Sequence, residues 1–208
     1  PTRASAISLG LVGSEMCIRD RDAPFVIDQG PGLPKWRPAN YTKKFYGPST
    51  MRLGIEKSRN LMTVRLAQTI GIESIAQYAH RFGIVDQLPR QLSMSLGAGE
   101  TTLLRLTAAY AMLVNGGRRI EPAFIERIQN RAGVTIERRD TRKCSLCGFP
   151  HALPDAVPQL NDTRERVTDS ASAFQLTWML KGVVERGPAR KVGKLGRPLG
   201  GKTGTTND

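Results

Sequence analysis

Two short motifs, far apart in the chain, carry side chains that are suited to catalysis. Ser58-Arg59-Asn60 provides a hydroxyl and an amide two positions apart. Lys202-Thr203-Gly204-Thr205 begins 144 positions after Ser58 and provides an amino group and two hydroxyls around a glycine. Acyl transfer through a serine needs a group that carries protons, hydrogen-bond donors for the oxyanion and a means of holding the substrate. The two motifs together contain groups of these kinds.

Each motif alone also has a purely structural explanation. Ser and Asn near a helix N-terminus are ordinary capping residues, and capping is the more common role for Ser58 and Asn60 taken alone. Lys202-Thr203-Gly204 alone is compatible with a basic turn, because the tripeptide often arises by chance. The occurrence of both motifs in this order is more specific than either one.

Together the motifs resemble part of the S-x-x-K, S-x-N and K-T-G constellation of the penicillin-recognising serine acyltransferases. The surrounding sequence is similar to that of bifunctional class A penicillin-binding proteins over residues 22–208. The segments that carry this resemblance are Gly54–Ala67, Ser95–Thr102, Leu106–Ala111, Asn115–Gly117, Val184–Gly187, Leu195–Pro198 and Gly201–Asp208.

The resemblance implies a D,D-transpeptidase that cross-links peptidoglycan stem peptides through a serine acyl-enzyme and that β-lactams acylate. In such an enzyme Ser58 would relay a proton to the leaving amine, Asn60 would hydrogen-bond the substrate amide and Lys202 would supply positive potential. Thr203-Gly204-Thr205 would bind the substrate, the threonines through hydroxyls and the glycine by allowing close approach of the substrate backbone.

The nucleophile of this family lies in an S-x-x-K motif that precedes S-x-N, and none occurs between Asp22 and Lys57. We therefore expect residues 22–208 to be an internal fragment of a transpeptidase domain, inactive alone. In the family a glycosyltransferase domain and an inner-membrane anchor come first, and the transpeptidase domain faces the periplasm. A further departure is Pro188, where the family pattern has threonine.

Residues 1–21 are interpreted as a non-native leader. The segment Glu15–Arg21 matches the translation of a transposon end that is used to build sequencing libraries. The alternative is a genuine N-terminal segment, because Ala4–Val12 is mildly apolar, as the core of a signal peptide would be.

The implied fold is α+β, of the penicillin-binding protein and serine β-lactamase type, and incomplete: the helical part and the start of the K-T-G strand. Apolar periodicity and turn residues predict the elements. They are helices over 58–70, 72–82, 101–114 and 169–185, and a hairpin of strands 123–128 and 134–138. The helix over 101–114 is expected to be buried on most sides because it contains few polar residues.

Composition excludes several classes of protein. The chain of 208 residues has a net charge of +13 and is 39% hydrophobic, enough apolar residues to form a core. No run of 18 apolar residues is present to cross a membrane as a helix, and three Cys and two His are too few for a zinc-finger array. No cofactor is expected.

Residues 118–166 are interpreted as the hairpin followed by an irregular, basic insertion. With only 6% aromatic residues and no nucleic-acid fold signature, the basic excess favours an anionic wall or membrane surface over nucleic acid. Within the insertion, Cys144, Cys147 and His151 are weak metal candidates, since one C-x-x-C is half of a zinc site. A disulfide or two free thiols is favoured, followed by zinc with a borrowed ligand and then by a redox role.

Two other functions remain open. One is a serine β-lactamase of the same superfold, which the expected buried helix ending at Gly117, the hairpin and the long separation of the two motifs disfavour. The other is a non-enzymatic basic binding module organised by Cys144 and Cys147.

Overall fold

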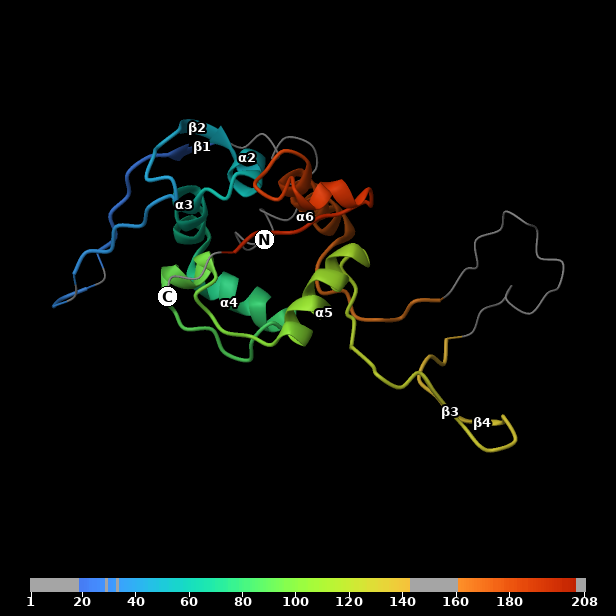
Figure 1. Cartoon of the computed structure of the whole chain (residues 1–208). Coiled ribbons are helices and arrows are strands. Elements are labelled where there is room, and N and C mark those ends of the chain that lie inside the picture. Colours follow the sequence, from blue (N-terminus) through green and yellow to red (C-terminus); the bar gives the residue numbers. More distant parts are fainter. Residues whose placement is uncertain (1–18, 29, 33, 143–160, 205–208) are drawn as a thin grey trace.

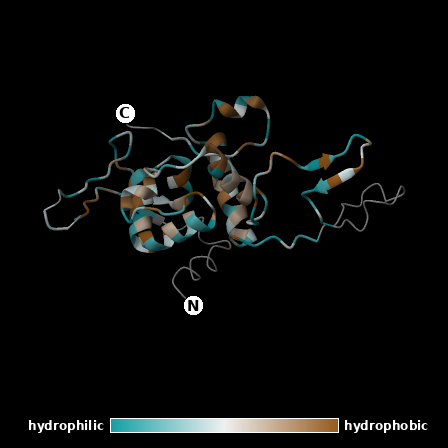
Figure 2. Ribbon diagram, turned by 90° about the horizontal axis from the view of Figure 1, so that it is seen from below, coloured by the Kyte–Doolittle hydropathy of each residue, from teal (hydrophilic) through white to brown (hydrophobic). Residues whose placement is uncertain are grey.

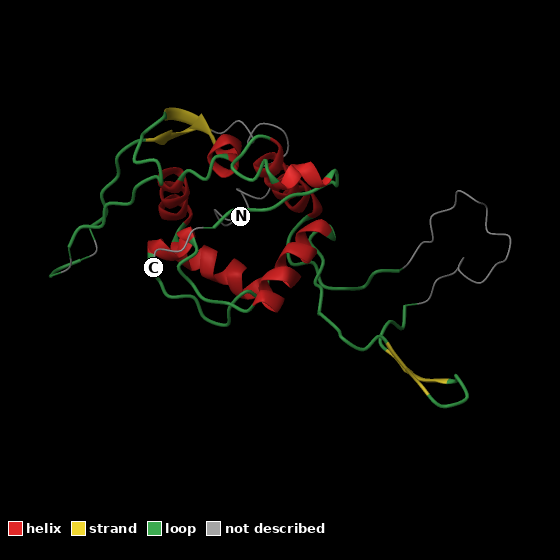
Figure 3. Cartoon of the chain, viewed as in Figure 1, coloured by secondary structure: helices red, strands yellow, loops and turns green. Residues whose placement is uncertain are grey.

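The computed structural model describes residues 19–28, 30–32, 34–142 and 161–204. Helices dominate, with short strands at two places (Figure 3). In chain order the elements are β1 (Arg19–Asp22), β2 (Gly47–Thr50), α2 (Met51–Glu56), α3 (Asn60–Ile70), α4 (Ile72–Arg81), the 3-10 helix η2 (Leu92–Leu96), α5 (Leu103–Val114), β3 (Arg127–Gln129), β4 (Thr135–Arg138), α6 (Ser170–Glu185) and the 3-10 helix η3 (Val192–Leu195).

The helices gather into one body, with β1 and β2 beside α2 and α3 (Figure 1). Strand β1 pairs antiparallel with β2, so that Asp22 lies opposite Gly47. Residues 19–21, the last three of the expected leader, thus form part of this strand pair. The α+β class is confirmed. In the described residues the β part consists of two separate two-stranded sheets.

Helix α3 contacts β1, α2, α4 and η2. It turns Leu61, Met62, Val64 and Ala67 inward, at the spacing that defines one helix face. The predicted helix over 58–70 begins at Asn60, so Ser58 lies outside it. A separate short helix, α2, precedes it, and its N-terminus is capped by the Thr50 side chain, which accepts a hydrogen bond from the Leu53 amide.

The predicted burial of α5 on most sides is wrong for the described residues. Leu103 is 82% exposed and Val114 is 76% exposed, while Ala108, Ala109 and Met112 turn inward. Ala108 and Met112 pack against Val167, which leads into α6. Among the described elements α5 makes its main contact with α6, and Leu103, Leu104, Leu106 and Val114 stay exposed.

The predictions for α4 and α6 are confirmed. Helix α6 begins after Asp169, whose carboxylate accepts a hydrogen bond from the Ser172 amide. The predicted hairpin is also present, although β3 and β4 are shorter than expected, and it projects from the helical body (Figures 1 and 2). Within the described ranges, no helix combines the length and the apolar character that a membrane crossing requires.

Residues 200–204 form no strand, in contrast to the predicted start of the K-T-G strand. A strand needs a hydrogen-bonded neighbour, and no described strand lies beside this segment. It runs along α6 instead, where the Gly201 amide donates to the Leu180 carbonyl over 3.2 Å.

Part of the insertion falls outside the described residues, and with it Cys144, Cys147 and His151. Among the side chains that are described, no group of three or more could hold a metal ion. Acidic neighbours pair with much of the basic excess around the insertion. These ion pairs are Arg118–Asp162, Arg119–Glu165, Arg139–Glu121, Arg142–Asp140 and Arg164–Asp162.

Candidate active site

The two motifs meet in space. The amino group of Lys202 donates a hydrogen bond of 2.6 Å to Oγ of Ser58, and a second one of 3.0 Å to the Thr203 carbonyl. An ammonium at this distance holds the Ser58 oxygen through a lone pair, and the hydroxyl proton stays free to point elsewhere. The contact therefore joins the S-x-N and K-T-G segments into one site.

Ser58 occupies a backbone conformation that ordinarily belongs to glycine. Its φ is +54°, in the left-handed region. The Arg59 amide donates to the Gly54 carbonyl and the Ser58 amide to the Ile55 carbonyl, which is the Schellman pattern that ends a helix, here α2. Serine at this position costs about 1 kcal/mol relative to glycine. The strained residue is thus the one whose hydroxyl oxygen accepts the hydrogen bond from Lys202.

Neither Ser58 nor Asn60 caps helix α3. The N-cap residue is Arg59, and it makes no side-chain capping bond. Asn60 is the first residue of α3, and its Nδ2 donates to the Ala39 carbonyl over 3.0 Å. The capping explanation for this motif is therefore wrong. In this state the Asn60 amide holds the preceding loop against the helix.

Arg59 lies between Ser58 and Asn60 and ties the S-x-N turn to residues earlier in the chain. Its guanidinium pairs with the fully buried Asp22 carboxylate at 2.6 Å and lies over the Tyr46 ring at 3.5 Å from the centroid. Asn40 donates to the same carboxylate over 2.7 Å and accepts from the Leu61 amide. A buried charge that is paired and hydrogen-bonded in this way resists displacement.

The K-T-G segment presents its polar groups to solvent. Thr203 and Gly204 are exposed, and a Cβ on Gly204 would meet no atom within 4 Å. This open space is compatible with a substrate backbone lying against the segment. Thr205, the second hydroxyl of the motif, lies outside the described residues.

Partial burial of the amino group lowers the pKa of Lys202 below its ordinary value of 10.5. No carboxylate is described within ion-pair distance of it, so desolvation is not offset by an opposite charge. The ammonium therefore gives up its proton more readily than that of an exposed lysine.

This shift can be measured on the amine itself. Competitive acetylation across the alkaline range is expected to give Lys202 a lower titration midpoint in the folded chain than in urea, where its pKa returns towards 10.5. At a given alkaline pH the neutral, reactive fraction is then larger in the folded chain. Peptide mass spectrometry gives both curves, and equal midpoints would contradict the shift. Activity that depends on the ammonium should fall as pH rises through this lowered pKa.

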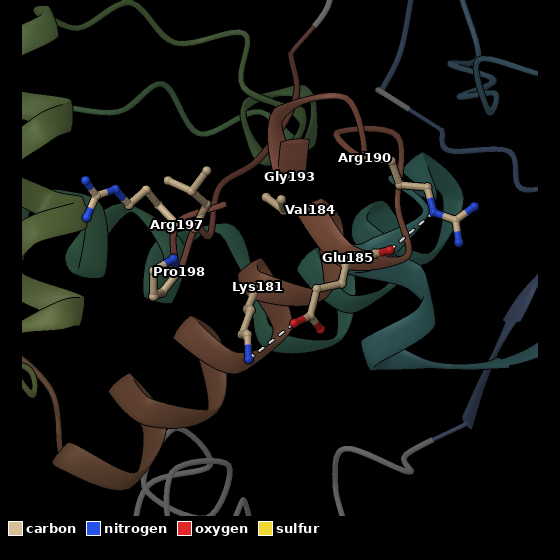
Figure 4. A pocket seen from close by; sticks show the side chains of 8 residues that line it. Lys181, Val184, Glu185, Arg190, Gly193, Arg197 and Pro198 are labelled. Atoms are coloured by element: carbon tan, nitrogen blue, oxygen red, sulfur yellow. Dashed lines mark hydrogen bonds and ion pairs between the residues drawn. The ribbon is translucent and has the colours of Figure 1, made fainter. Parts of the chain in front are cut away.

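A hollow of about 530 Å³ lies next to the site, between α6 and the segment that leads to Lys202. Figure 4 shows Lys181 and Arg197 at its edge, with Lys181 paired to Glu185 at 3.2 Å. Ser58, Asn60 and Lys202 are not among its lining residues. The candidate site formed by Ser58 and Lys202 therefore lies outside this hollow.

The profile of the penicillin binding protein transpeptidase domain matches residues 21–208. The chain belongs to this family. Penicillin-binding protein 1A of Rickettsia bellii is 50% identical over 189 residues, and that of Pseudomonas aeruginosa is 33% identical over 218 residues. Both alignments cover 90% of this chain, but only 24% and 26% of the relatives. This chain therefore spans about a quarter of the length of these relatives.

Solved structures agree with this assignment. Penicillin-binding protein 1A from Haemophilus influenzae superposes with a TM-score of 0.77 at 29% identity, over 92% of this chain and 31% of that one. The D,D-transpeptidase domain from Eggerthella lenta superposes with a TM-score of 0.67 over 99% of this chain and 51% of that one, and at 17% identity it supports the fold alone. The resemblance to class A penicillin-binding proteins is thus confirmed.

Sequence reasoning missed the residues that support the penicillin-binding motifs. Asp22 and Asn40 lie in a segment without periodicity, and Glu56 and Arg186 look like ordinary charged residues near helix ends. The structure shows that Asp22, Asn40 and Glu56 are buried. Only the unusual density of charge around Ser58 could have indicated that these groups are paired.

Proposed function

We propose that this chain forms the S-x-N and K-T-G side of a peptidoglycan D,D-transpeptidase site. The observation that carries the proposal is the 2.6 Å hydrogen bond between Lys202 and Ser58, whose residues lie 144 positions apart. Membership of the transpeptidase domain family supports the reaction class. The attacking serine would come from an S-x-x-K motif, which this sequence does not contain.

In the proposed reaction that serine attacks the carbonyl carbon of the D-Ala-D-Ala bond. The C–N bond breaks, and the terminal D-Ala leaves as an amine that must gain a proton. The attacking serine would lose its proton to the lysine of its own S-x-x-K motif, and that lysine would pass a proton to Oγ of Ser58 as Ser58 gives its hydroxyl hydrogen to the leaving nitrogen. Because Lys202 donates to Oγ of Ser58, that hydroxyl hydrogen is free to point to the nitrogen. An amine from a neighbouring stem peptide then takes the acyl group, the C–O bond to the serine breaks, and the proton that the amine gives up returns to the serine by the reverse route. The Lys202 ammonium stabilises negative charge throughout.

The other groups of the proposed site bind the substrate. The hydroxyls of Thr203 and Thr205 would hydrogen-bond the terminal carboxylate, and the space around Gly204 would admit the substrate backbone. Asn60 would exchange its bond to Ala39 for one to the substrate amide. β-Lactams would acylate the same serine.

We also propose that residues 22–208 are a partial domain, inactive alone, of a longer protein that carries a glycosyltransferase domain and an inner-membrane anchor. Residues 1–21 would be a non-native leader, and residues 118–166 the hairpin plus its basic insertion. The domain would face the periplasm, with the arginine-rich surface of that insertion towards anionic wall polymer or lipid rather than nucleic acid. The length of the relatives and the arginines of the insertion support this arrangement.

Glycine at position 58 tests the role of the hydroxyl separately from the fold. In the full-length protein, Ser58→Gly is expected to raise the free energy of unfolding by about 1 kcal/mol, because glycine adopts the left-handed backbone without strain. The same change is expected to slow labelling by fluorescent penicillin about 100-fold, since the proton relay is lost.

Ser58→Ala is the matched variant, because it removes the hydroxyl but keeps the strain. It should label as slowly as Ser58→Gly without the gain in stability. Wild-type labelling rates in both variants would overturn the role of Ser58. Rapid hydrolysis of penicillin by the wild-type protein, with no persistent adduct, would favour a β-lactamase instead.

A further inference from the structure

We propose that Glu56, held by Arg186, is a positioning residue that keeps Ser58 in place to receive the hydrogen bond from Lys202. The inference rests on the proposed function of Ser58. It concerns an ion pair outside the two motifs, in which Glu56 is buried and Arg186 is half exposed, and which acts through Ser58 rather than on the substrate.

The pair joins the end of α2 to the end of α6. The Arg186 guanidinium donates to both carboxylate oxygens of Glu56, with Nη2–Oε1 at 2.6 Å and Nε–Oε2 at 3.2 Å. The Glu56 side chain is only 4% exposed. Glu56 is the last residue of α2, two positions before Ser58. A two-point bond fixes both the distance and the orientation of the carboxylate, which a single contact cannot do.

Two glycines make room for this pair. A Cβ on Gly182 would overlap Oε1 of Glu56, and a Cβ on Gly187 would overlap its backbone oxygen. Neither glycine has the positive φ that would otherwise favour this residue. Close approach of α2 to α6 therefore accounts for both of them. Lys57 also donates to the Arg186 carbonyl over 2.5 Å. The ion pair, the close packing at the two glycines and this hydrogen bond together hold the end of α2 against α6.

Helix α6 thereby sets both ends of the catalytic contact. Arg186 fixes Glu56 and with it the strained turn at Ser58, while the Leu180 carbonyl fixes Gly201, the residue before Lys202. Leu180, within α6, and Arg186, the C-cap of this helix, are six positions apart. Small displacement at either anchor would lengthen the 2.6 Å bond between Lys202 and Ser58.

A general contribution to stability is the competing explanation of the ion pair. The guanidinium of Arg186 belongs to a half-exposed side chain, so solvent screens the pair and its net contribution to stability is modest. The strain at Ser58 instead requires a local force that holds the turn, and the Glu56–Arg186 pair is placed to supply it. The two explanations differ in one expectation. Only positioning predicts that the effect of a Glu56 substitution on the acylation rate depends on the Ser58 hydroxyl.

A double-mutant cycle tests this dependence in the full-length protein. Fluorescent penicillin is the probe, and the second-order acylation rate constant is measured for wild type, Glu56→Gln, Ser58→Ala and the double variant. Glu56→Gln is expected to slow acylation about tenfold when Ser58 is present, and less than about twofold when alanine replaces it. Arg186→Lys, which keeps the charge but loses the two-point bond, is expected to behave like Glu56→Gln.

Two controls separate positioning from folding. Val167→Ala truncates a fully buried residue that precedes the N-terminus of α6, whereas the pair lies at the C-terminus of this helix, so it should lower the melting temperature without slowing acylation. Asp86→Asn removes an exposed carboxylate whose two oxygens both accept from Nη2 of Arg105, and it should change neither quantity.

The outcomes are distinguishable. Equal slowing by Glu56→Gln in both backgrounds, or no slowing in either background, would overturn the positioning role while leaving the proposed function intact. If Ser58→Ala itself acylates at the wild-type rate, the proposed function of Ser58 fails instead.

Discussion

Alanine at position 202 is expected to lower the acylation rate constant of the full-length protein about 100-fold or more. Lys202 is the described cation that contacts Ser58, and its removal takes away both the hydrogen bond and the positive potential. Pre-organised donors at sites of developing charge are worth two to three powers of ten when one is deleted. Stability should change little, because the residue as a whole is exposed and only its amino group is partly buried. The measurement is penicillin labelling under single-turnover conditions.

Arginine at the same position separates charge from geometry. Lys202→Arg keeps the positive charge, but its planar guanidinium cannot place one compact donor at the position of Nζ. It should recover part of the lost rate and remove any alkaline limb that the Lys202 ammonium causes, because guanidinium stays charged. Lys194→Ala, in η3, removes an exposed lysine outside the two motifs and should label as the wild type does. Full activity of Lys202→Ala would exclude this residue from the chemistry.

The helices whose patterns are strong in the sequence were predictable. For α4 and α6 the apolar spacing, the cap at Asp169 and the glycine before Ile72 determine where each helix begins and ends. Helix α2 was missed because six residues with a glycine in the middle are too short to show a period. Its existence depends on packing against α6 rather than on its own propensity.

The error at α5 has a different origin. The apolar composition of this helix indicates that something covers it, but composition does not show which residues do so. In the described residues one face packs against Val167, and Leu103 remains exposed on another. The same reasoning applies to the K-T-G segment, because an extended sequence becomes a strand only beside a partner strand.

The candidate site was predictable in its residues but not in its geometry. Ser58, Asn60 and Lys202 follow from the motifs, and the structure brings Lys202 onto Ser58. The left-handed backbone at Ser58 was not predictable, because glycine is the expected residue there. Nor could the sequence pair Glu56 with Arg186, since 130 positions separate them and only the fold brings them together.

Alanine at Gly187 is expected to cause the largest loss of stability, about 3 kcal/mol. Its Cβ would overlap the backbone oxygens of Glu56 and Val183, which belong to different helices. A backbone atom cannot rotate away as the end of a side chain can, so α2 must move away from α6. Urea unfolding of the full-length protein should show a lower midpoint with an unchanged slope.

Gly193→Ala is the matched control, because its Cβ would lie 3.6 Å from Val184 Cγ1, an ordinary contact. It should change stability by less than about 0.5 kcal/mol. Movement of α2 also displaces Glu56 and the turn at Ser58, so the folded fraction of Gly187→Ala should label more slowly with penicillin. Loss of stability without slower labelling would mean that the end of α2 can move while Ser58 stays in place. If Gly187→Ala and Gly193→Ala are equally stable, α2 and α6 are not packed closely enough at Gly187 to exclude a Cβ.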